Sequence, residues 1–152
     1  MADTKNFAKI ALSAFALTAA GILTAIALLP TPTQARPRNL NLSLERPTDH
    51  GVFQIQLKSS LEPIQISKVH QWSVHASGAD GVPVDGANFA VDGGMPEHGH
   101  GLPTAPRAAS AAGPGNYVIN GMKFSMTGWW VLKMDVKAPD GQADTITFNL
   151  VL

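Results

Sequence analysis

The feature that most constrains the fold of this chain is a repeated alternation of apolar and polar residues. The alternation begins near Leu40 and returns in segment after segment up to Leu152, whereas no stretch after residue 36 keeps a 3.6-residue period. Successive side chains of a strand point to opposite faces, so this pattern predicts half-buried strands. Roughly seven or eight short strands joined by turns are typical of an all-β chain, an antiparallel β-sandwich of the immunoglobulin-like type.

The predicted strands also identify the predicted core. The first expected strand covers residues 40–44, and the longest covers residues 64–76, where the even-numbered positions include His70 and Trp72 and form the inward face. Turn residues such as Pro139-Asp140-Gly141 separate the strands. The side chains expected inside are Phe53, Ile55, Leu57, Ile66, Trp72, Val74, Phe89, Val91, Tyr117, Leu132, Met134, Ile146, Phe148 and Leu150.

The N-terminal residues predict export. Two lysines precede an uncharged run, Ile10–Leu29, and a short stretch of proline and small residues follows as far as Ala35. This order is typical of a signal peptide, and a run of about 20 residues is also long enough to span a bilayer. We therefore expect residues 1–35 to be a signal peptide or an uncleaved membrane anchor, and residues 36–152 to form the β-sandwich domain. The lysines favour the cytoplasmic side, which leaves the domain periplasmic or membrane-anchored outside the cytoplasm.

Composition excludes several classes of function. The chain has no cysteine, which rules out a disulfide framework, a thiolate metal site and a cysteine nucleophile. Eleven basic and eleven acidic residues balance, so there is no electrostatic reason to expect nucleic acid as a partner. Motifs for a nucleophile elbow, a zinc-protease helix or a phosphate-binding loop are absent from the sequence. We expect no enzymatic activity and no catalytic residues.

The stretch Gly93–Pro103 is where the sequence suggests chemistry. It contains two histidines, a methionine and a carboxylate among four glycines and two prolines, so we expect an irregular loop held by the sandwich. Imidazole binds copper, and a thioether favours its softer oxidation state, Cu(I). The predicted site holds one copper ion on Met95, His98 and His100, with His70 or Met126 as a further ligand.

A purely structural alternative stays open for each of these residues. The glycines and prolines can form a tight corner between the sheets, with His98 and His100 in water or bonded to backbone carbonyls. His70 is more simply explained as a core histidine bonded to the backbone. Met126, like Met122 and Met134, is expected to pack in the core, since methionine fills irregular gaps. His50 and His75 are expected to be exposed and have no predicted role.

The second half of the chain resembles the YtkA-like / FixH-like group of exported domains. The resemblance covers about residues 64–152 and rests on four motifs: His70-Gln71-Trp72, Gly93-Gly94-Met95-Pro96-Glu97-His98-Gly99-His100-Gly101-Leu102-Pro103, Gly115-Asn116-Tyr117 and Gly121-Met122-Lys123-Phe124-Ser125-Met126-Thr127-Gly128-Trp129-Trp130. It implies an immunoglobulin-like, membrane-associated or periplasmic domain, with copper handling as a theme of the group.

Two functions are compatible with the sequence. The first is an exported module that binds a metal ion, copper in particular, through the Gly/Met/His loop. The second is a structural or assembly module that supports a membrane protein partner without metal.

Overall fold

The computed structural model describes residues 33–111 and 113–152, and within them the chain forms nine strands and no helix. It follows that this part of the chain has no helix able to cross a membrane. The predicted signal or anchor, Ile10–Leu29, lies outside the described residues. The strands are β1 (Glu45–Pro47), β2 (Phe53–Ser59), β3 (His70–Gly78), β4 (Asn88–Met95), β5 (His100–Gly101), β6 (Arg107–Ser110), β7 (Asn116–Met122), β8 (Trp129–Lys137) and β9 (Ala143–Val151).

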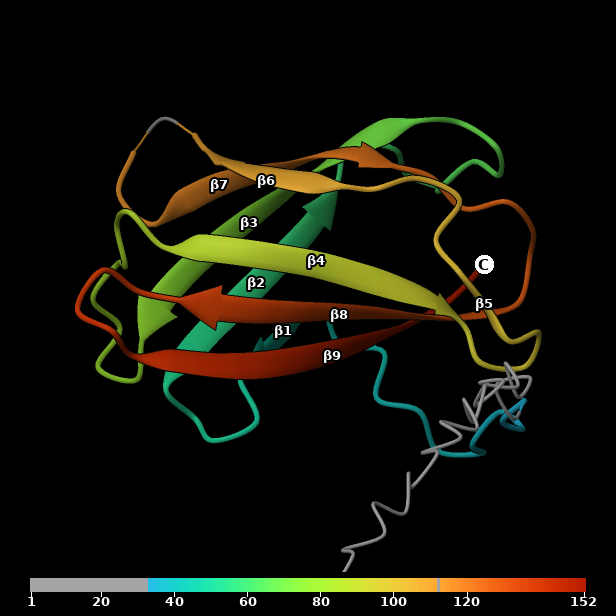
Figure 1. Cartoon of the computed structure of the whole chain (residues 1–152), viewed down its shortest axis with the longest axis horizontal. Helices are drawn as coiled ribbons and strands as arrows, with labels where there is room; N and C mark the ends of the chain where they lie inside the picture. The colour runs from blue at the N-terminus through green and yellow to red at the C-terminus, as the bar shows by residue number, and fades with distance from the viewer. Residues whose placement is uncertain (1–32, 112) are drawn as a thin grey trace, which may run out of the picture.

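The strands form two antiparallel sheets that pack face to face, as Figure 1 shows. One sheet has the order β1-β2-β3-β7-β6 and the other β5-β4-β8-β9. Strands β2-β3-β7-β6 and β4-β8-β9 reproduce the two sheets of a constant-type immunoglobulin domain, which has four and three strands in this connectivity. Strand β1 extends the first sheet, and β5 pairs with the end of β4. The predicted immunoglobulin-like antiparallel sandwich is confirmed.

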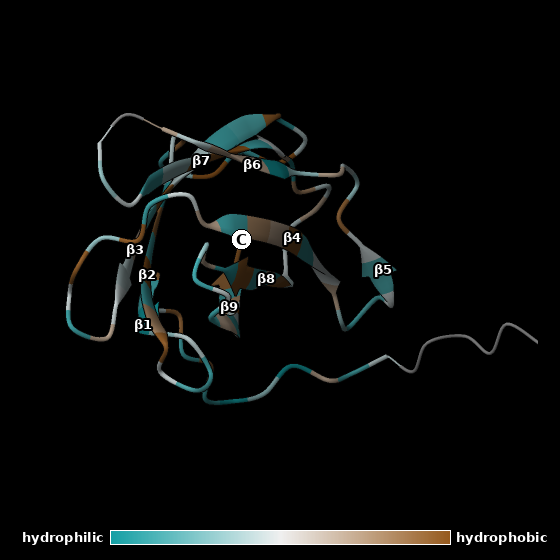
Figure 2. Ribbon diagram, turned by 60° about the vertical axis from the view of Figure 1, so that its left-hand side comes forward, coloured by the Kyte–Doolittle hydropathy of each residue, from teal (hydrophilic) through white to brown (hydrophobic). Residues whose placement is uncertain are grey.

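The core lies between the two sheets and follows the alternation of the sequence. Buried and exposed residues alternate strictly along β2 and along most of β8 and β9. Figure 2 shows the strands from another side, with both apolar and polar residues along them. Of the predicted core, Ile66 and Val91 are half-buried, and the other twelve residues are buried.

Two predicted strands are shorter than expected. Residues 40–44 are not a strand: Leu42 is exposed, and the backbone N–H of Ser43 bonds to the side chain of Asn41. The predicted strand 64–76 begins only at His70. Ser67 has φ 64°, a left-handed conformation that interrupts extended backbone.

The loops divide between two ends of the sandwich (Figure 1). At one end lie the turn of the β4–β5 hairpin and the loops 60–69 and 123–128, and we call this the hairpin end. The opposite end carries the loops 48–52, 79–87 and 138–142.

The segment 33–44 enters the fold at the hairpin end. The backbone N–H of Gln34 donates to the carbonyl of Pro96 at 2.8 Å, and the side chain of Asn149 donates to the carbonyl of Asn41 at 3.3 Å. Trp129 lies on the outer face of its sheet but is only 4% exposed, and its indole N–H donates to Asn149 Oδ1 at 2.9 Å. Trp129 is thus a covered residue and not an open contact surface.

Candidate functional site

The Gly/Met/His stretch is more regular than predicted. Strand β4 continues through Met95, and Met95 pairs with His100 at the start of β5. The carbonyl of Met95 accepts the backbone N–H groups of His98 and Gly99, at 3.0 and 2.9 Å. The expectation of an irregular loop from Gly93 is therefore wrong, since the stretch is a β-hairpin with a four-residue turn.

The two glycines before Met95 explain how this hairpin packs. A Cβ on Gly93 would lie 2.3 Å from the carbonyl oxygen of Val131, and a Cβ on Gly94 would lie 2.3 Å from that of His100. Real Cβ atoms do not approach so closely, so only glycine lets the neighbouring strands reach β4 here. The glycines thus serve close strand pairing rather than loop flexibility.

The turn brings His98 and His100 together on the surface. Both residues are exposed, and their ring centroids are 6.0 Å apart with the ring planes inclined by 38°. His100 Nδ1 lies 3.0 Å from the carbonyl oxygen of Gly101, which can only accept, so Nδ1 carries the proton. The other ring nitrogen of His100, Nε2, therefore presents a lone pair.

The two predicted sulfur ligands differ in accessibility. Met95 and His100 form a cross-strand pair, so their side chains share a face of the sheet, but Met95 is only 1% exposed. Its methyl group packs against Gly128, where an added Cβ would lie 2.7 Å away. Met126 is 41% exposed, so its prediction as a core residue is wrong. Solvent thus reaches Met126, whereas Met95 is enclosed.

Trp130 connects the hairpin to the loop that carries Met126. Its indole N–H donates to the carbonyl of Met126 at 3.0 Å, and its ring meets that of His100 edge to face at 5.7 Å between centroids. The buried indole of Trp130 therefore forms a floor beneath the exposed His100.

His70 lies apart from this group. It is buried, its Nδ1 lies 3.1 Å from the carbonyl of Lys68, and its Nε2 accepts the indole N–H of Trp72 at 2.8 Å. Both ring nitrogens are thereby occupied. The prediction of a core histidine bonded to the backbone is confirmed, and the structure does not bring His70 to the exposed histidines. Its ring contact with Phe124 links it to them only indirectly.

The acid, histidine and cysteine side chains of the described residues do not form any group of three that could hold a metal ion. His98 and His100 are two such side chains, so an ion bound to them requires a further ligand of another kind. The thioethers of Met95 and Met126 are the candidates that this end of the fold supplies.

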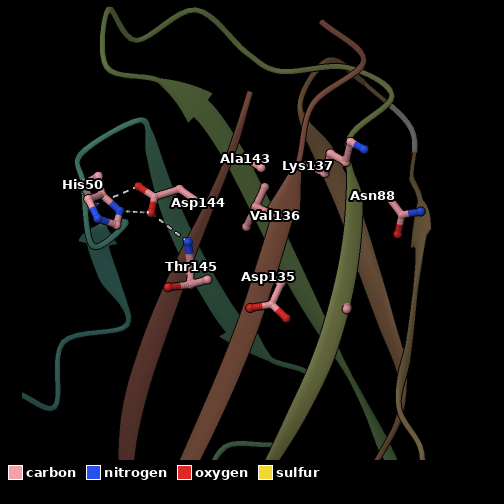
Figure 3. A pocket seen from close by; sticks show the side chains of 9 residues that line it. His50, Asn88, Asp135, Val136, Lys137, Ala143, Asp144 and Thr145 are labelled. Carbon is pink, nitrogen blue, oxygen red and sulfur yellow. Dashed lines mark hydrogen bonds and ion pairs between the residues drawn. The ribbon is translucent and has the colours of Figure 1, made fainter. Parts of the chain in front are cut away.

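A second cluster, missed by the sequence predictions, lies at the opposite end. His50 Nδ1 is 2.7 Å from Asp144 Oδ1, and the backbone N–H of His50 donates to Asp144 Oδ2 at 2.9 Å (Figure 3). The His50 side chain is 82% exposed and the Asp144 side chain is fully buried. The pair joins the turn before β2 to the start of β9, and its residues are 94 positions apart, which is why no local pattern reveals it.

This pair changes the proton affinity of both groups. Burial alone would raise the pKa of Asp144, but hydrogen bonds from Thr48, His50 and the backbone N–H of Thr145 outweigh it and hold the pKa well below its usual range. The hydrogen bond to Asp144 and the charge of that carboxylate raise the pKa of His50. Both shifts favour the charged forms of the two side chains.

A pocket of about 550 Å³ opens beside the pair on the outer face of the second sheet. Its lining combines the small side chains of Ala90 and Ala143 with the polar ones of Asp135, Lys137 and Thr145. The hydroxyl of Thr145 in this lining donates to Asp49 at 2.8 Å and not to His50. The His50–Asp144 pair joins the turn before β2 to the start of β9, and we call it a clamp between β2 and β9.

Comparison with known proteins places the fold in a family. A crystal structure of a DUF4426 family protein from Pseudomonas aeruginosa PAO1 is 19% identical, with a TM-score of 0.53 over 72% of this chain and 94% of that one, a likeness of fold alone. A comparison with curated proteins finds no match. The YtkA-like family matches residues 49–135, more than half of the chain, and this range includes the hairpin, the loop 123–128 and Trp130. The chain belongs to the YtkA-like family.

Proposed function

We propose that this YtkA-like domain is an exported, periplasmic or membrane-associated module that binds one copper ion at the hairpin end of its sandwich. His98 and His100 supply nitrogen ligands, and a thioether from Met95 or Met126 completes the set. The observation that carries the proposal is the pair of exposed imidazoles at one hairpin turn, His98 within the turn and His100 at the start of β5, 6.0 Å apart between ring centroids.

The ring spacing suits a shared ion. A ring nitrogen binds a metal at about 2.0–2.1 Å, which puts the ring centroid about 3.2 Å from the ion. Two rings on one ion then have centroids about 4.5–6.4 Å apart, depending on the angle between the bonds. The observed separation falls in this range and is compatible with both rings binding one ion.

The hydrogen bond of His100 supports the same role. Histidine ligands usually donate their second ring N–H to a carbonyl or carboxylate, which fixes the tautomer and the ring orientation. His100 Nδ1 makes that bond to the carbonyl of Gly101, and Trp130 packs against the ring. The ring is therefore held by a hydrogen bond and by packing, and Nε2 is the nitrogen left to bind an ion. His70 is left out of the proposed set because both of its nitrogens have partners.

A copper titration tests the proposal. We expect one Cu(I) per chain, measured by competition with a chromophoric chelator, and we expect His98→Ala with His100→Ala to weaken binding by more than about 100-fold, since even outer-shell partners of a metal are worth about 10–100-fold. His50→Gln removes an exposed histidine at the opposite end and is the matched control. If the double variant binds as tightly as the parent chain, the hairpin is a corner of the scaffold, and the metal-free assembly module becomes the better hypothesis.

The location needs its own test. Export is inferred from the N-terminal sequence, so a reporter that is active only outside the cytoplasm is fused after Leu152. Activity of the fusion, and its loss when Ile10–Leu29 is deleted, support export. A silent fusion with a full-length product in the cell would contradict it.

A further inference from the structure

The two ends of the sandwich differ in exposed apolar residues. Of the five large apolar side chains that are exposed among the described residues, only Val82 lies at the opposite end. Val69, Met126 and Val151 lie at the hairpin end, and Leu42 lies on the segment 33–44 that enters there. Exposed apolar residues gathered in one area mark contact with a partner or a membrane.

The charges divide in the same way. At the opposite end, the loops 48–52, 79–87 and 138–142 contain four aspartates and neither lysine nor arginine: Asp49, Asp80, Asp85 and Asp140. The loops of the hairpin end and residues 33–39 contain four basic residues against two acidic ones: Arg36, Arg38, Lys68 and Lys123 against Glu62 and Glu97. The basic residues lie among the exposed apolar ones, a combination that favours an anionic lipid surface.

The chain path ties the hairpin end to the predicted membrane segment. The uncharged run ends at Leu29, and the backbone of Gln34 is already bonded to Pro96 in the hairpin turn. Five residues of fully extended chain reach at most about 18 Å. If Ile10–Leu29 stays in the bilayer, the hairpin turn cannot lie farther than that from the point where the chain leaves it.

We propose that the hairpin end of the domain lies against an anionic phospholipid surface, with Val69, Met126 and Val151 facing the headgroups and the four basic residues around them. The acidic loops then point away from the bilayer, because their negative charge is repelled by the anionic headgroups. This orientation does not depend on copper. It places His98 and His100 beside the membrane.

The absence of cysteine from the chain allows a direct test. The full chain, including Ile10–Leu29, is reconstituted without metal in nanodiscs of phosphatidylcholine with phosphatidylglycerol and a headgroup-labelled nitroxide lipid. A fluorophore is attached at Val69→Cys or Met126→Cys, with Val82→Cys as the matched control, an exposed apolar residue at the opposite end. Strands of nine residues span about 30 Å, so the control label should be beyond the range of the quencher.

We expect more than about half of the emission to be quenched at positions 69 and 126 and almost none at position 82, as that separation requires. Replacement of Arg36, Arg38, Lys68 and Lys123 by Gln, or the use of phosphatidylcholine alone, should reduce the difference. Equal quenching at the three positions, or quenching that ignores these four replacements, overturns the proposal. Because copper is absent throughout, failure here leaves the copper proposal to be decided by its own titration.

Discussion

Trp72 and His70 share one hydrogen bond inside the sandwich, in which the indole N–H donates to His70 Nε2 at 2.8 Å. A tryptophan N–H can only donate, so this bond fixes His70 as the neutral tautomer with its proton on Nδ1, which faces the carbonyl of Lys68. Two buried polar groups at the start of β3 thereby satisfy each other. The bond explains why a histidine is tolerated at this core position, and why it is a poor candidate for a metal ligand.

The first prediction concerns the stability of this pair. Trp72→Phe keeps an aromatic ring but leaves His70 Nε2 without its donor, so we expect a loss of about 1–3 kcal/mol in the free energy of unfolding. Trp72→Ala should cost about 3–5 kcal/mol, because a fully buried side chain leaves a cavity. Denaturant titration measures both values. A loss of only a few tenths of a kcal/mol in Trp72→Ala would contradict the placement of this ring in the core.

The second prediction is a pH-dependent contribution of His50 and Asp144 to stability. Because the pKa of His50 is raised in the folded state, protonated His50 stabilises the fold. This contribution to the free energy of unfolding is complete below about pH 6.5, the ordinary pKa of histidine, and is lost as pH rises through the raised pKa. Because the pKa of Asp144 is lowered in the folded state, ionised Asp144 also stabilises the fold. This contribution is complete above about pH 3.9, the ordinary pKa of aspartate, and is lost as pH falls through the lowered pKa. The clamp should therefore be strongest between about pH 4 and 6.5.

Chemical denaturation of the parent chain and of His50→Gln across this range tests the clamp. We expect the difference in unfolding free energy between them to be largest near about pH 5–6 and to shrink toward about pH 9. Lys58→Gln, an exposed charge on β2, serves as the control and should show no such profile. A difference that stays constant with pH would mean that His50 acts by packing alone.

The third prediction uses a matched pair of glycines in the hairpin. Gly94 and Gly101 face each other across β4 and β5, but an added Cβ would lie 2.3 Å from a carbonyl oxygen at Gly94 and 3.5 Å from one at Gly101. Gly94→Ala should separate the strands and destabilise the domain by about 1–3 kcal/mol, and Gly101→Ala should have little effect. Thermal unfolding compares the two. If both substitutions had equally small effects on the unfolding temperature, β5 would be free to move away from β4.

The sequence predicted the sandwich well because each strand repeats one rule. Phe53, Ile55 and Leu57 on β2, like Ile146, Phe148 and Leu150 on β9, are buried because a half-buried strand presents every second residue to the core. The rule failed at residues 40–44, where the leucines alternate but, of their backbone groups, only the carbonyl of Leu44 bonds to a neighbouring strand, at Leu57 of β2. Alternation shows which face of a strand is apolar, but it does not show whether a neighbouring strand is available for pairing.

The candidate site was predicted in part for the same reason. Local spacing was enough to suggest that His98 and His100 converge, because one hairpin turn carries both. The exposure of Met126 depends on a loop that packs on Trp130, and the bond between His50 and Asp144 joins residues far apart in the chain. Such relationships arise from the tertiary fold, and no periodicity in a single sequence contains them.

The last prediction separates the two thioethers of the proposed copper site. Met126 is open to solvent, whereas Met95 is enclosed behind His100 and Gly128. We expect Met126→Leu to weaken Cu(I) binding at least about tenfold with little change in stability, because leucine keeps the volume but lacks the soft sulfur. Met95→Leu should weaken binding less. Met134→Leu, a buried methionine in the middle of β8, controls for repacking.

The binding reaction can be followed by tryptophan emission, since Trp130 contacts the ring of His100. If Met95→Leu causes the larger loss, the ion enters beneath the loop 123–128, and binding then requires that loop to move away from the hairpin.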